Sequence, residues 1–276
     1  MTDMNNEKKV GLALGSGGVK GLAHIGVLKV LVENNIPIDY IAGTSIGSLV
    51  GAVFSAYKDI EKIEKIVLDT NWKHALALLD PSWRGGIIKG NKVEKLITSW
   101  LPNISFLELK IPLTIVATDI LSGQKVNLNS GNLISAIRAS SAVPPVFKPV
   151  KYNDYMLVDG GISNPVPANI AREMGADLVI AVNLDSGNFN GNSTNHHITP
   201  SDVSLTKTSI RALNIMRYYL ARKYLNLADV VIEPLVPEIG LVGWNKFFDR
   251  NQAKKIIEAG QKAAQDAIPE IKKILQ

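Results

Sequence analysis

Gly43-Thr-Ser-Ile-Gly47 is the stretch that decides the fold expected for this chain of 276 residues. A short apolar run at residues 40–42 precedes it, and a run with helical character follows at residues 48–57. We therefore expect a strand, a sharp turn that holds Ser45, and a helix. A serine with glycine two positions away on either side is typical of a nucleophile elbow, where a side chain at either glycine would clash with the neighbouring strand or helix. A glycine-rich turn without a catalytic role fits the same residues, so the interpretation depends on the rest of the chain.

A second glycine-rich loop lies upstream at Gly15-Ser-Gly-Gly-Val-Lys-Gly21, between an expected strand at residues 9–14 and an expected helix at residues 22–33. Such a loop leaves several backbone N–H groups outside the helix hydrogen bonds, and these groups can bind an anion. A dinucleotide-binding fingerprint is disfavoured because Lys20 occupies the position of its third glycine. A P-loop is disfavoured because no Gly-Lys-Ser/Thr sequence is present.

The remaining interpretation of this loop is an oxyanion hole. Adjacent turns between strands and helices of a parallel sheet lie at the same carboxyl edge, which would place the loop beside Ser45. The N–H groups of Gly17 and Gly18 would then stabilise the charge that forms when Ser45 attacks an acyl carbonyl.

Strands and helices alternate along most of the chain, which predicts an α/β fold with a mostly parallel central sheet and helices on both faces. Further strands are expected at residues 112–118, 124–128, 155–158, 176–183 and 229–233, and further helices at residues 59–79, 91–100, 133–139, 168–174, 205–227 and 250–275. We expect one domain over residues 1–276, with core motifs in residues 10–182, a flexible loop at residues 187–201 and a C-terminal part at residues 205–276 that completes it.

A helical insertion around residues 59–108 is expected to form a cap over the site. It carries Trp72, Trp83 and Trp100, and two interpretations of these side chains remain open. One is ordinary packing of the insertion, and the other is contact with acyl chains or a membrane interface.

The composition excludes several classes of protein. There is no cysteine, so we expect no disulfides, no cysteine-based metal site and no cysteine nucleophile. The first nine residues are polar and of mixed charge, which is unlike a secretory signal. No apolar run approaches the ~18 residues needed to span a bilayer. We therefore expect a cytoplasmic protein without a transmembrane segment.

The formal net charge of +5 has two interpretations, general solubility and attraction to an anionic membrane surface. The expected helix at residues 205–227 contributes to this charge with a basic side, which is typical of a solvated face and less often of a membrane- or phosphate-binding face. Its members are Arg211, Arg217, Arg222 and Lys223. No basic run with interleaved aromatic residues stands out, so we expect no nucleic-acid partner.

Ser45 needs a base, and no histidine is well placed to serve. One histidine lies on the helix after the glycine loop, where a structural role is expected, one lies in the expected cap, and two lie in the polar loop, which is a poor place for a preorganised base. These residues are His24, His74, His196 and His197, respectively.

Asp159 is a better candidate for the base. It ends an expected strand before Gly160 and Gly161, which would place it at the same edge of the sheet as Ser45. A desolvated aspartate that is hydrogen-bonded to the serine hydroxyl could accept its proton. From these residues alone, a plain Asp-Gly-Gly turn is the preferred interpretation.

Four blocks of this sequence, spread over residues 10–182, resemble in content and order those of the patatin-like phospholipases. The blocks are Gly11-Leu-Ala-Leu-Gly-Ser-Gly-Gly-Val-Lys-Gly21 with the following residues 22–28, Gly43-Thr-Ser-Ile-Gly47, Arg138-Ala-Ser-Ser-Ala-Val-Pro144, and Asp159-Gly-Gly161 with Asn164-Pro-Val-Pro167. The resemblance implies a three-layer patatin-like sandwich and a Ser-Asp dyad in place of a triad.

By this resemblance, Ser45 is the nucleophile, Asp159 is the general base, and the amides of Gly17 and Gly18 form the oxyanion hole. The supporting motif residues are Gly15, Ser16, Lys20, Gly43, Gly47, Gly160 and Gly161. Among them, Lys20 holds the position of a basic residue of the family, and Ser16 stands where most members carry glycine.

The implied reaction is hydrolysis of an acyl ester of a phospholipid, lysophospholipid or neutral lipid through an acyl-enzyme, without a metal ion or cofactor. The expected partner is the lipid or acyl-ester substrate, with peripheral contact to a membrane. Two alternatives remain at this point: acyl transfer with the same dyad, and a non-catalytic lipid-binding regulator that keeps the fold.

Overall fold

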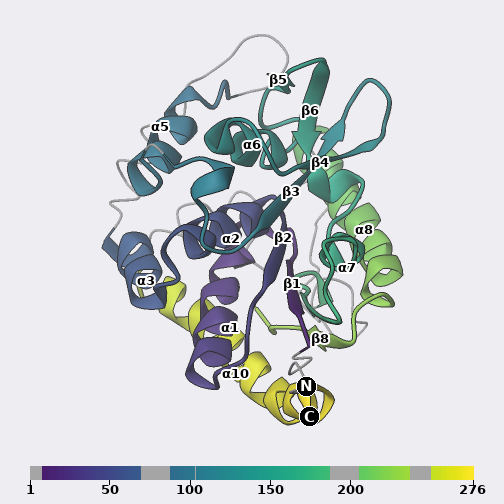
Figure 1. Cartoon of the computed structure of the whole chain (residues 1–276). Helices are drawn as coiled ribbons and strands as arrows, with labels where there is room; N and C mark the ends of the chain where they lie inside the picture. Colours follow the sequence, from purple (N-terminus) through teal and green to yellow (C-terminus); the bar gives the residue numbers. More distant parts are fainter. Residues whose placement is uncertain (1–7, 70–87, 103, 187–204, 237–249) are drawn as a thin grey trace, which may run out of the picture.

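The computed structural model describes residues 8–69, 88–102, 104–186, 205–236 and 250–276. Within these residues, a sheet of eight strands lies between two layers of helices (Figure 1). The predicted α/β architecture with helices on both faces of a central sheet is therefore confirmed.

The sheet mixes parallel and antiparallel pairs. Its strand order is β5-β6-β3-β2-β1-β7-β8, with β4 paired to β3. The pairs of β1 with β2 and β7, of β2 with β3, and of β7 with β8 are parallel, whereas β4 and β6 run antiparallel to β3, and β5 runs antiparallel to β6. The strands are β1 (Val10–Leu14), β2 (Tyr40–Thr44), β3 (Leu113–Asp119), β4 (Lys125–Leu128), β5 (Val150–Tyr152), β6 (Tyr155–Asp159), β7 (Leu178–Val182) and β8 (Val230–Ile232).

Helices cover both faces of this sheet because alternate strand residues point to opposite sides. The helices are α1 (Leu22–Glu33), α2 (Ile46–Tyr57), α3 (Ile60–Asp69), α5 (Asn91–Trp100), α6 (Leu133–Ser140), α7 (Ala168–Glu173), α8 (Leu205–Leu225) and α10 (Arg250–Leu275), with short 3₁₀ helices η1 (Gly18–Gly21), η2 (Phe106–Glu108) and η3 (Gly160–Ile162). Leu12 and Leu14 pack in the core with α1, α2, α6 and α10. Ala13 and Ala42 pack in the second core with α7 and with Ala221 of α8.

Most predicted elements are present, with shifts at their ends. The bounds of α1 and α5 match the prediction, whereas α2 begins two residues earlier than expected because Ser45 itself is its N-cap. Strand β5 was not predicted; it pairs with β6 across the turn at residues 153–154. The predicted helix at residues 59–79 ends at Asp69 within the described residues.

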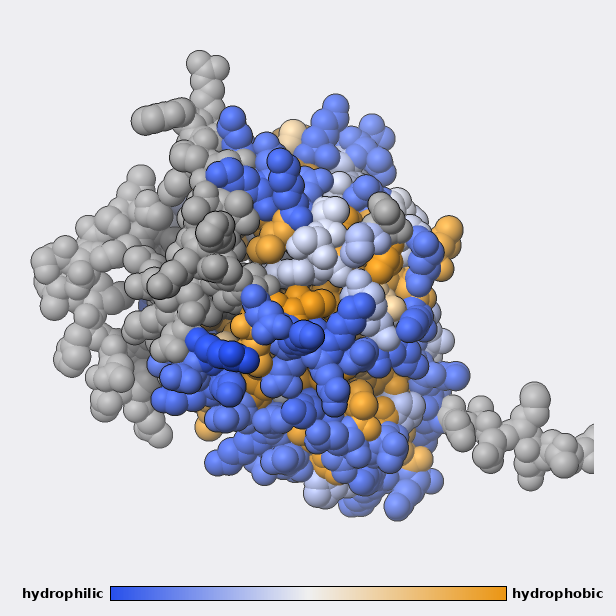
Figure 2. All heavy atoms as spheres, turned by 90° about the vertical axis from the view of Figure 1, so that its left-hand side faces the viewer, coloured by the Kyte–Doolittle hydropathy of each residue, from blue (hydrophilic) through white to orange (hydrophobic). Residues whose placement is uncertain are grey.

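Part of the expected cap is present as α3 and α5. Its central residues 70–87, with Trp72, His74 and Trp83, lie outside the described residues, so the role of a cap stays a prediction. The predicted loop at residues 187–201, with His196 and His197, also lies outside them. On the side of α3 and α5, most of the described surface is hydrophilic, with apolar residues near its middle and at scattered positions elsewhere (Figure 2). Among the described helices, none is both long and apolar enough to cross a bilayer.

One feature of the sheet positions the site: β2 and β6 meet end to end along β3. β2 pairs with residues 113–116 of β3, and β6 pairs with residues 117–119. Because β2 runs parallel to β3 and β6 runs antiparallel to it, the carboxyl ends of β2 and β6 face each other where Val116 meets Ala117.

Hydrogen bonds show that both strands use the same edge of β3. Successive residues of a strand direct their backbone groups to opposite edges. The carbonyl of Pro112 accepts a hydrogen bond from the N–H of Ile41 in β2, and the N–H of Ile120 donates to the carbonyl of Met156 in β6. The even-numbered residues around β3 therefore pair with both β2 and β6. The N–H of the odd-numbered Asp119 donates to the carbonyl of Gln124, next to β4 on the other edge of β3.

Candidate active site

The sharp turn at Ser45 joins β2 to α2. Ser45 has φ 55° and ψ −122°, a conformation that costs a residue other than glycine roughly 1–3 kcal/mol. Its carbonyl accepts a 2.6 Å hydrogen bond from Ser48 Oγ in the first turn of α2. A Cβ at Gly43 would lie 2.7 Å from the carbonyl oxygen of Gly47, and one at Gly47 would collide with the carbonyl of Leu14. The clash predicted at both glycines is confirmed.

The hydroxyl of Ser45 donates a 2.5 Å hydrogen bond to Oδ2 of Asp159. Both residues are buried, with 6% and 5% of their surface exposed. Asp159 was expected at the end of a strand, at the same edge of the sheet as Ser45, and no direction was predicted for this strand. Asp159 ends β6, which runs antiparallel to β3, and it reaches Ser45 because β2 and β6 meet end to end.

The two glycines after Asp159 allow this junction to close. A Cβ at Gly160 would collide with the carbonyl of Val116 of β3. The N–H of Gly161 donates a 2.7 Å hydrogen bond to Oδ1 of Asp159, so each carboxylate oxygen has one hydrogen-bond donor. The Asp-Gly-Gly sequence therefore orients the carboxylate toward Ser45.

Burial raises the pKa of the Asp159 carboxyl to about 6. The hydrogen bonds from Ser45 and Gly161 and the positive charge of Arg217 lower this pKa, and the charge of Asp185 raises it, but desolvation is the largest effect. A carboxylate whose pKa lies this near neutrality can take up and return a proton at neutral pH.

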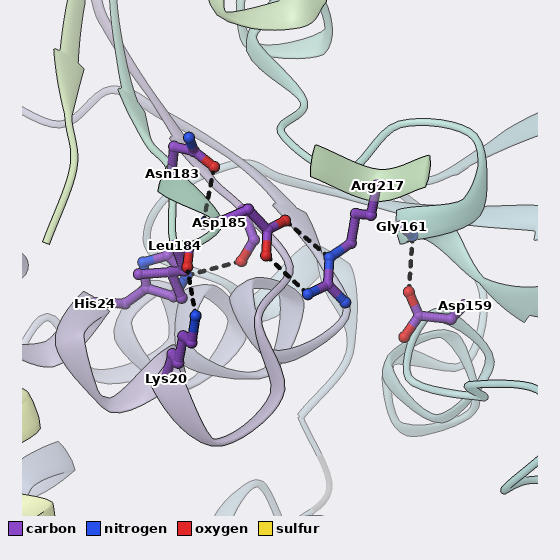
Figure 3. A network of polar contacts seen from close by, with 9 residues as sticks. Lys20, His24, Asp159, Gly161, Asn183, Leu184, Asp185 and Arg217 are labelled. Atoms are coloured by element: carbon purple, nitrogen blue, oxygen red, sulfur yellow. Dashed lines mark hydrogen bonds and ion pairs between the residues drawn. The ribbon is translucent and has the colours of Figure 1, made fainter. Parts of the chain in front are cut away.

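Arg217 of α8 lies between Asp185 and the turn that holds Asp159 (Figure 3). Its Nε and Nη2 donate to Asp185 at 2.8 and 2.7 Å, in a bidentate ion pair. Only 1% of the Asp185 side chain and 20% of the Arg217 side chain are exposed. A Cβ on Gly161 would lie 2.9 Å from Oδ1 of Asp159 and 3.3 Å from Cδ of Arg217, which places the arginine next to the carboxylate.

The sequence interpretation missed this ion pair, because it assigned Arg217 to the solvated basic side of the helix. Arg222 and Lys223 are indeed exposed, whereas Arg217 turns inward with Tyr224, whose hydroxyl donates to the carbonyl of Ser163. The spacing of Leu213, Arg217 and Tyr224 at helical intervals was the signal that could have shown this, since a lone cation within an inward face needs a buried partner.

The upstream glycine loop packs directly on this turn. The N–H groups of Gly15 and Ser16 are used within the fold, by the carbonyls of Val182 and Pro165 at 3.1 and 2.8 Å. Within the described part of the chain, the N–H groups of Gly17 and Gly18 have no acceptor. Gly18 is exposed at φ +57°, and a Cβ there would meet no atom within 4 Å. Two backbone amides of this loop are thus left without an acceptor in the described part of the chain, and their role as an oxyanion hole stays a prediction.

Three polar side chains of the loop and of α1 are buried, those of Ser16, Lys20 and His24. Figure 3 shows Lys20 and His24. Lys20 Nζ donates to the carbonyl of Leu184 at 3.3 Å. The ring of His24 is fully buried and hydrogen-bonded through Nε2 to the carbonyl of Gly15 at 2.8 Å, and burial lowers its pKa to about 4. His24 is therefore a neutral support of the loop. The hydroxyl of Ser16 has no hydrogen-bond partner among the described residues.

Comparisons with known proteins agree on one family. The model of the patatin-like phospholipase family matches residues 12–172. An uncharacterized NTE family protein of Mycobacterium tuberculosis is 39% identical over 182 residues, which cover 66% of this chain and 50% of that protein. The neuropathy target esterase sws of Drosophila melanogaster is 32% identical over 185 residues, which cover 64% of this chain and 13% of that protein. This chain thus spans half the length or less of these curated relatives.

A solved structure shares the fold. VipD from Legionella pneumophila superposes with a TM-score of 0.56 at 14% sequence identity, covering 96% of this chain and 67% of that chain. This likeness concerns the fold alone, because function resides in the site and not in the architecture.

Proposed function

This chain belongs to the patatin-like phospholipase family, and we propose on this premise that it is a serine acyl-ester hydrolase that acts on lipids through a dyad of Ser45 and Asp159. The observation that carries the proposal is the 2.5 Å hydrogen bond between these two buried side chains. The names of the relatives, a phospholipase family and an esterase, favour a lipid ester as the substrate class.

In the first half of the reaction, Ser45 Oγ forms a bond to the acyl carbon while its proton passes to Oδ2 of Asp159. The carbonyl oxygen of the substrate takes up an electron pair, and the N–H groups of Gly17 and Gly18 stabilise the resulting oxyanion. The ester C–O bond then breaks, and the leaving alcohol takes the proton from Asp159. This step leaves the acyl group on Ser45.

In the second half, water attacks the acyl carbon and gives its proton to Asp159. The bond to Ser45 then breaks, the carboxylic acid leaves, and the proton returns from Asp159 to Ser45 Oγ. Asp159 thus acts as the base each time a nucleophile attacks and as the acid each time the bond to the leaving oxygen breaks. A carboxyl whose pKa is about 6 suits both roles.

The described residues support one catalytic unit. β8 pairs with β7, and α10 shares the core with α1, so the C-terminal part completes the sheet and its cover. We take residues 1–276 as a single patatin-like domain that reaches its lipid substrate by peripheral contact with a membrane, which the formal charge of +5 favours.

The test is the Ser45→Ala variant with a short p-nitrophenyl ester and with a panel of phospholipids and lysophospholipids. We expect turnover to fall by on the order of 10³-fold or more, and a fluorophosphonate probe to label Ser45 of the unaltered protein only. Ser55→Ala is the matched control, because Ser55 is a fully buried serine of α2 whose hydroxyl has no partner in the described residues. Unchanged turnover in Ser45→Ala would contradict the proposal.

A further inference from the structure

The turn at Ser45 has a backbone N–H that the sheet does not satisfy. Along the parallel ladder of β2 and β3, Ile41 N–H donates to the carbonyl of Pro112 at 3.0 Å. Such bonds recur at every second residue of a strand, so after Gly43 the ladder would reach from Ser45 N–H to the carbonyl of Val116. The chain turns at Ser45, and this last bond of the ladder is not made directly.

Ser140, the last residue of α6, fills this gap in the ladder. Its Oγ accepts a 2.8 Å hydrogen bond from Ser45 N–H and donates a 2.6 Å hydrogen bond to the carbonyl of Val116. Ser140 has no exposed surface, so no water replaces either bond. One hydroxyl therefore joins the strained turn to the strand beside it.

The same end of α6 also holds the partner of Ser45. Two residues after Ser140, the carbonyl of Ala142 accepts a 3.0 Å hydrogen bond from the backbone N–H of Asp159. On the other side of that residue, the carbonyl of Asp159 accepts a 3.0 Å bond from Thr118 Oγ1. The segment from Ser140 to Ala142 thus contacts the backbone of both Ser45 and Asp159.

We propose that residues 140–142 position the dyad, with the Ser140 hydroxyl fixing the Ser45 turn at the distance from Asp159 that proton transfer needs. Ser140 is a positioning residue, because it touches Ser45 and not the substrate. The inference rests on the proposed function and gives a role to the block Arg138-Ala-Ser-Ser-Ala-Val-Pro144. Small errors in the placement of a reacting group cost activity steeply, by up to about 10²-fold for a shift of 1 Å.

The test compares Ser140→Ala, Ser140→Thr and Ser140→Cys with Ser55→Ala, by kcat and KM on a p-nitrophenyl ester, by the rate of fluorophosphonate labelling of Ser45, and by thermal melting. We expect Ser140→Ala to lower kcat and the labelling rate by about 10–100-fold, with KM changed by less than about threefold. Threonine keeps the hydroxyl and should restore most of the activity, whereas cysteine, a weak hydrogen-bonding group, should not. Ser55→Ala should match the unaltered protein.

The outcomes distinguish a failure of the proposed hydrolase function from a failure of the positioning role of Ser140. An inactive, unlabelled parent protein would overturn the proposed function itself. An active parent with folded Ser140→Ala or Ser140→Cys at parental kcat would overturn only the positioning role. The positioning role would also be overturned if kcat fell in all Ser140 variants only in proportion to the fraction of protein that the melts show to be unfolded. If Ser140→Ala does not fold, the comparison of the cysteine and threonine variants, which are close to serine in size, decides the question.

Discussion

Ser45 and Asp159 lie 114 positions apart in the sequence, yet a 2.5 Å hydrogen bond joins their side chains because each follows or ends a strand that stops at the same point of β3. β2 reaches this point from one direction and β6 from the other. The backbones approach closely around this point, because a Cβ at Gly43, Gly47 or Gly160 would collide with a neighbouring carbonyl group.

Gly47→Ala should disrupt the junction from the side of α2. The added Cβ would collide with the backbone carbonyl of Leu14, which belongs to β1, a strand paired on both sides, and cannot move aside alone. We expect a loss of about 1–3 kcal/mol in the free energy of unfolding and a loss of most of the esterase activity. Chemical denaturation and ester turnover measure the two effects.

Gly51→Ala is the control for this prediction, on the same helix. The nearest atom to its added Cβ is a methyl carbon of Ile41 at 2.9 Å, which a small side-chain movement can relieve. Alanine is also a better helix former than glycine by about 1 kcal/mol. If Gly47→Ala were as stable and active as Gly51→Ala, the tight approach of α2 to β1 would not be required.

Arg217→Gln should shift the acid limb of the pH–rate profile to higher pH. Activity needs ionised Asp159, so kcat/KM should fall as the pH drops through about 6 in the unaltered protein. Arg217 lowers the pKa of Asp159 and Asp185 raises it, so removal of the arginine leaves the charge of Asp185 unopposed by a nearby positive charge. The limb should therefore move upward, as measured by kcat/KM from pH 4.5 to 9.

Arg222→Gln is the matched control, because Arg222 lies on the exposed side of the same helix. Its profile should coincide with that of the unaltered protein. Arg217→Gln also removes the bidentate ion pair with the buried carboxylate of Asp185, which should lower the stability by about 3–5 kcal/mol. Coincident acid limbs in all three proteins would show that Arg217 does not act on Asp159.

These charges also show how far the sequence alone could go. The helical periodicity and the glycine loop predicted α1 to its ends, and the family resemblance is confirmed by the match over residues 12–172. Local patterns say nothing of strand direction, however, since that depends on pairing with distant segments. The antiparallel course of β6 and the unpredicted β5 followed from such pairing. Arg217 was missed for the same reason, because its partner Asp185 lies on another element.

Ser16→Ala should stabilise the protein. Only 2% of the surface of Ser16 is exposed, and its hydroxyl has no hydrogen-bond partner among the described residues. Folding therefore removes this hydroxyl from water without a compensating hydrogen bond. We expect a gain of about 1 kcal/mol in the free energy of unfolding, since burial of an unsatisfied polar group costs about 1–3 kcal/mol. Ester turnover should stay within about threefold, because the amides of Gly17 and Gly18 are unaffected. A loss of stability would show that the hydroxyl has a partner.

Asp159→Asn should abolish activity and yet stabilise the protein at high pH. Burial raises the pKa of Asp159 from its usual range near ~4 to about 6, so the folded state binds the proton more tightly than the unfolded state. The contribution of this carboxyl to stability is therefore most favourable below pH ~4 and declines as the pH rises to about 6. Asparagine cannot ionise and avoids this decline. Because the amide accepts only one of the two hydrogen bonds, we expect a net gain of ~1–2 kcal/mol at pH 8. Denaturation of both proteins at pH 4 and pH 8 measures it, and a gain that is equal at the two pH values would contradict the assigned ionisation.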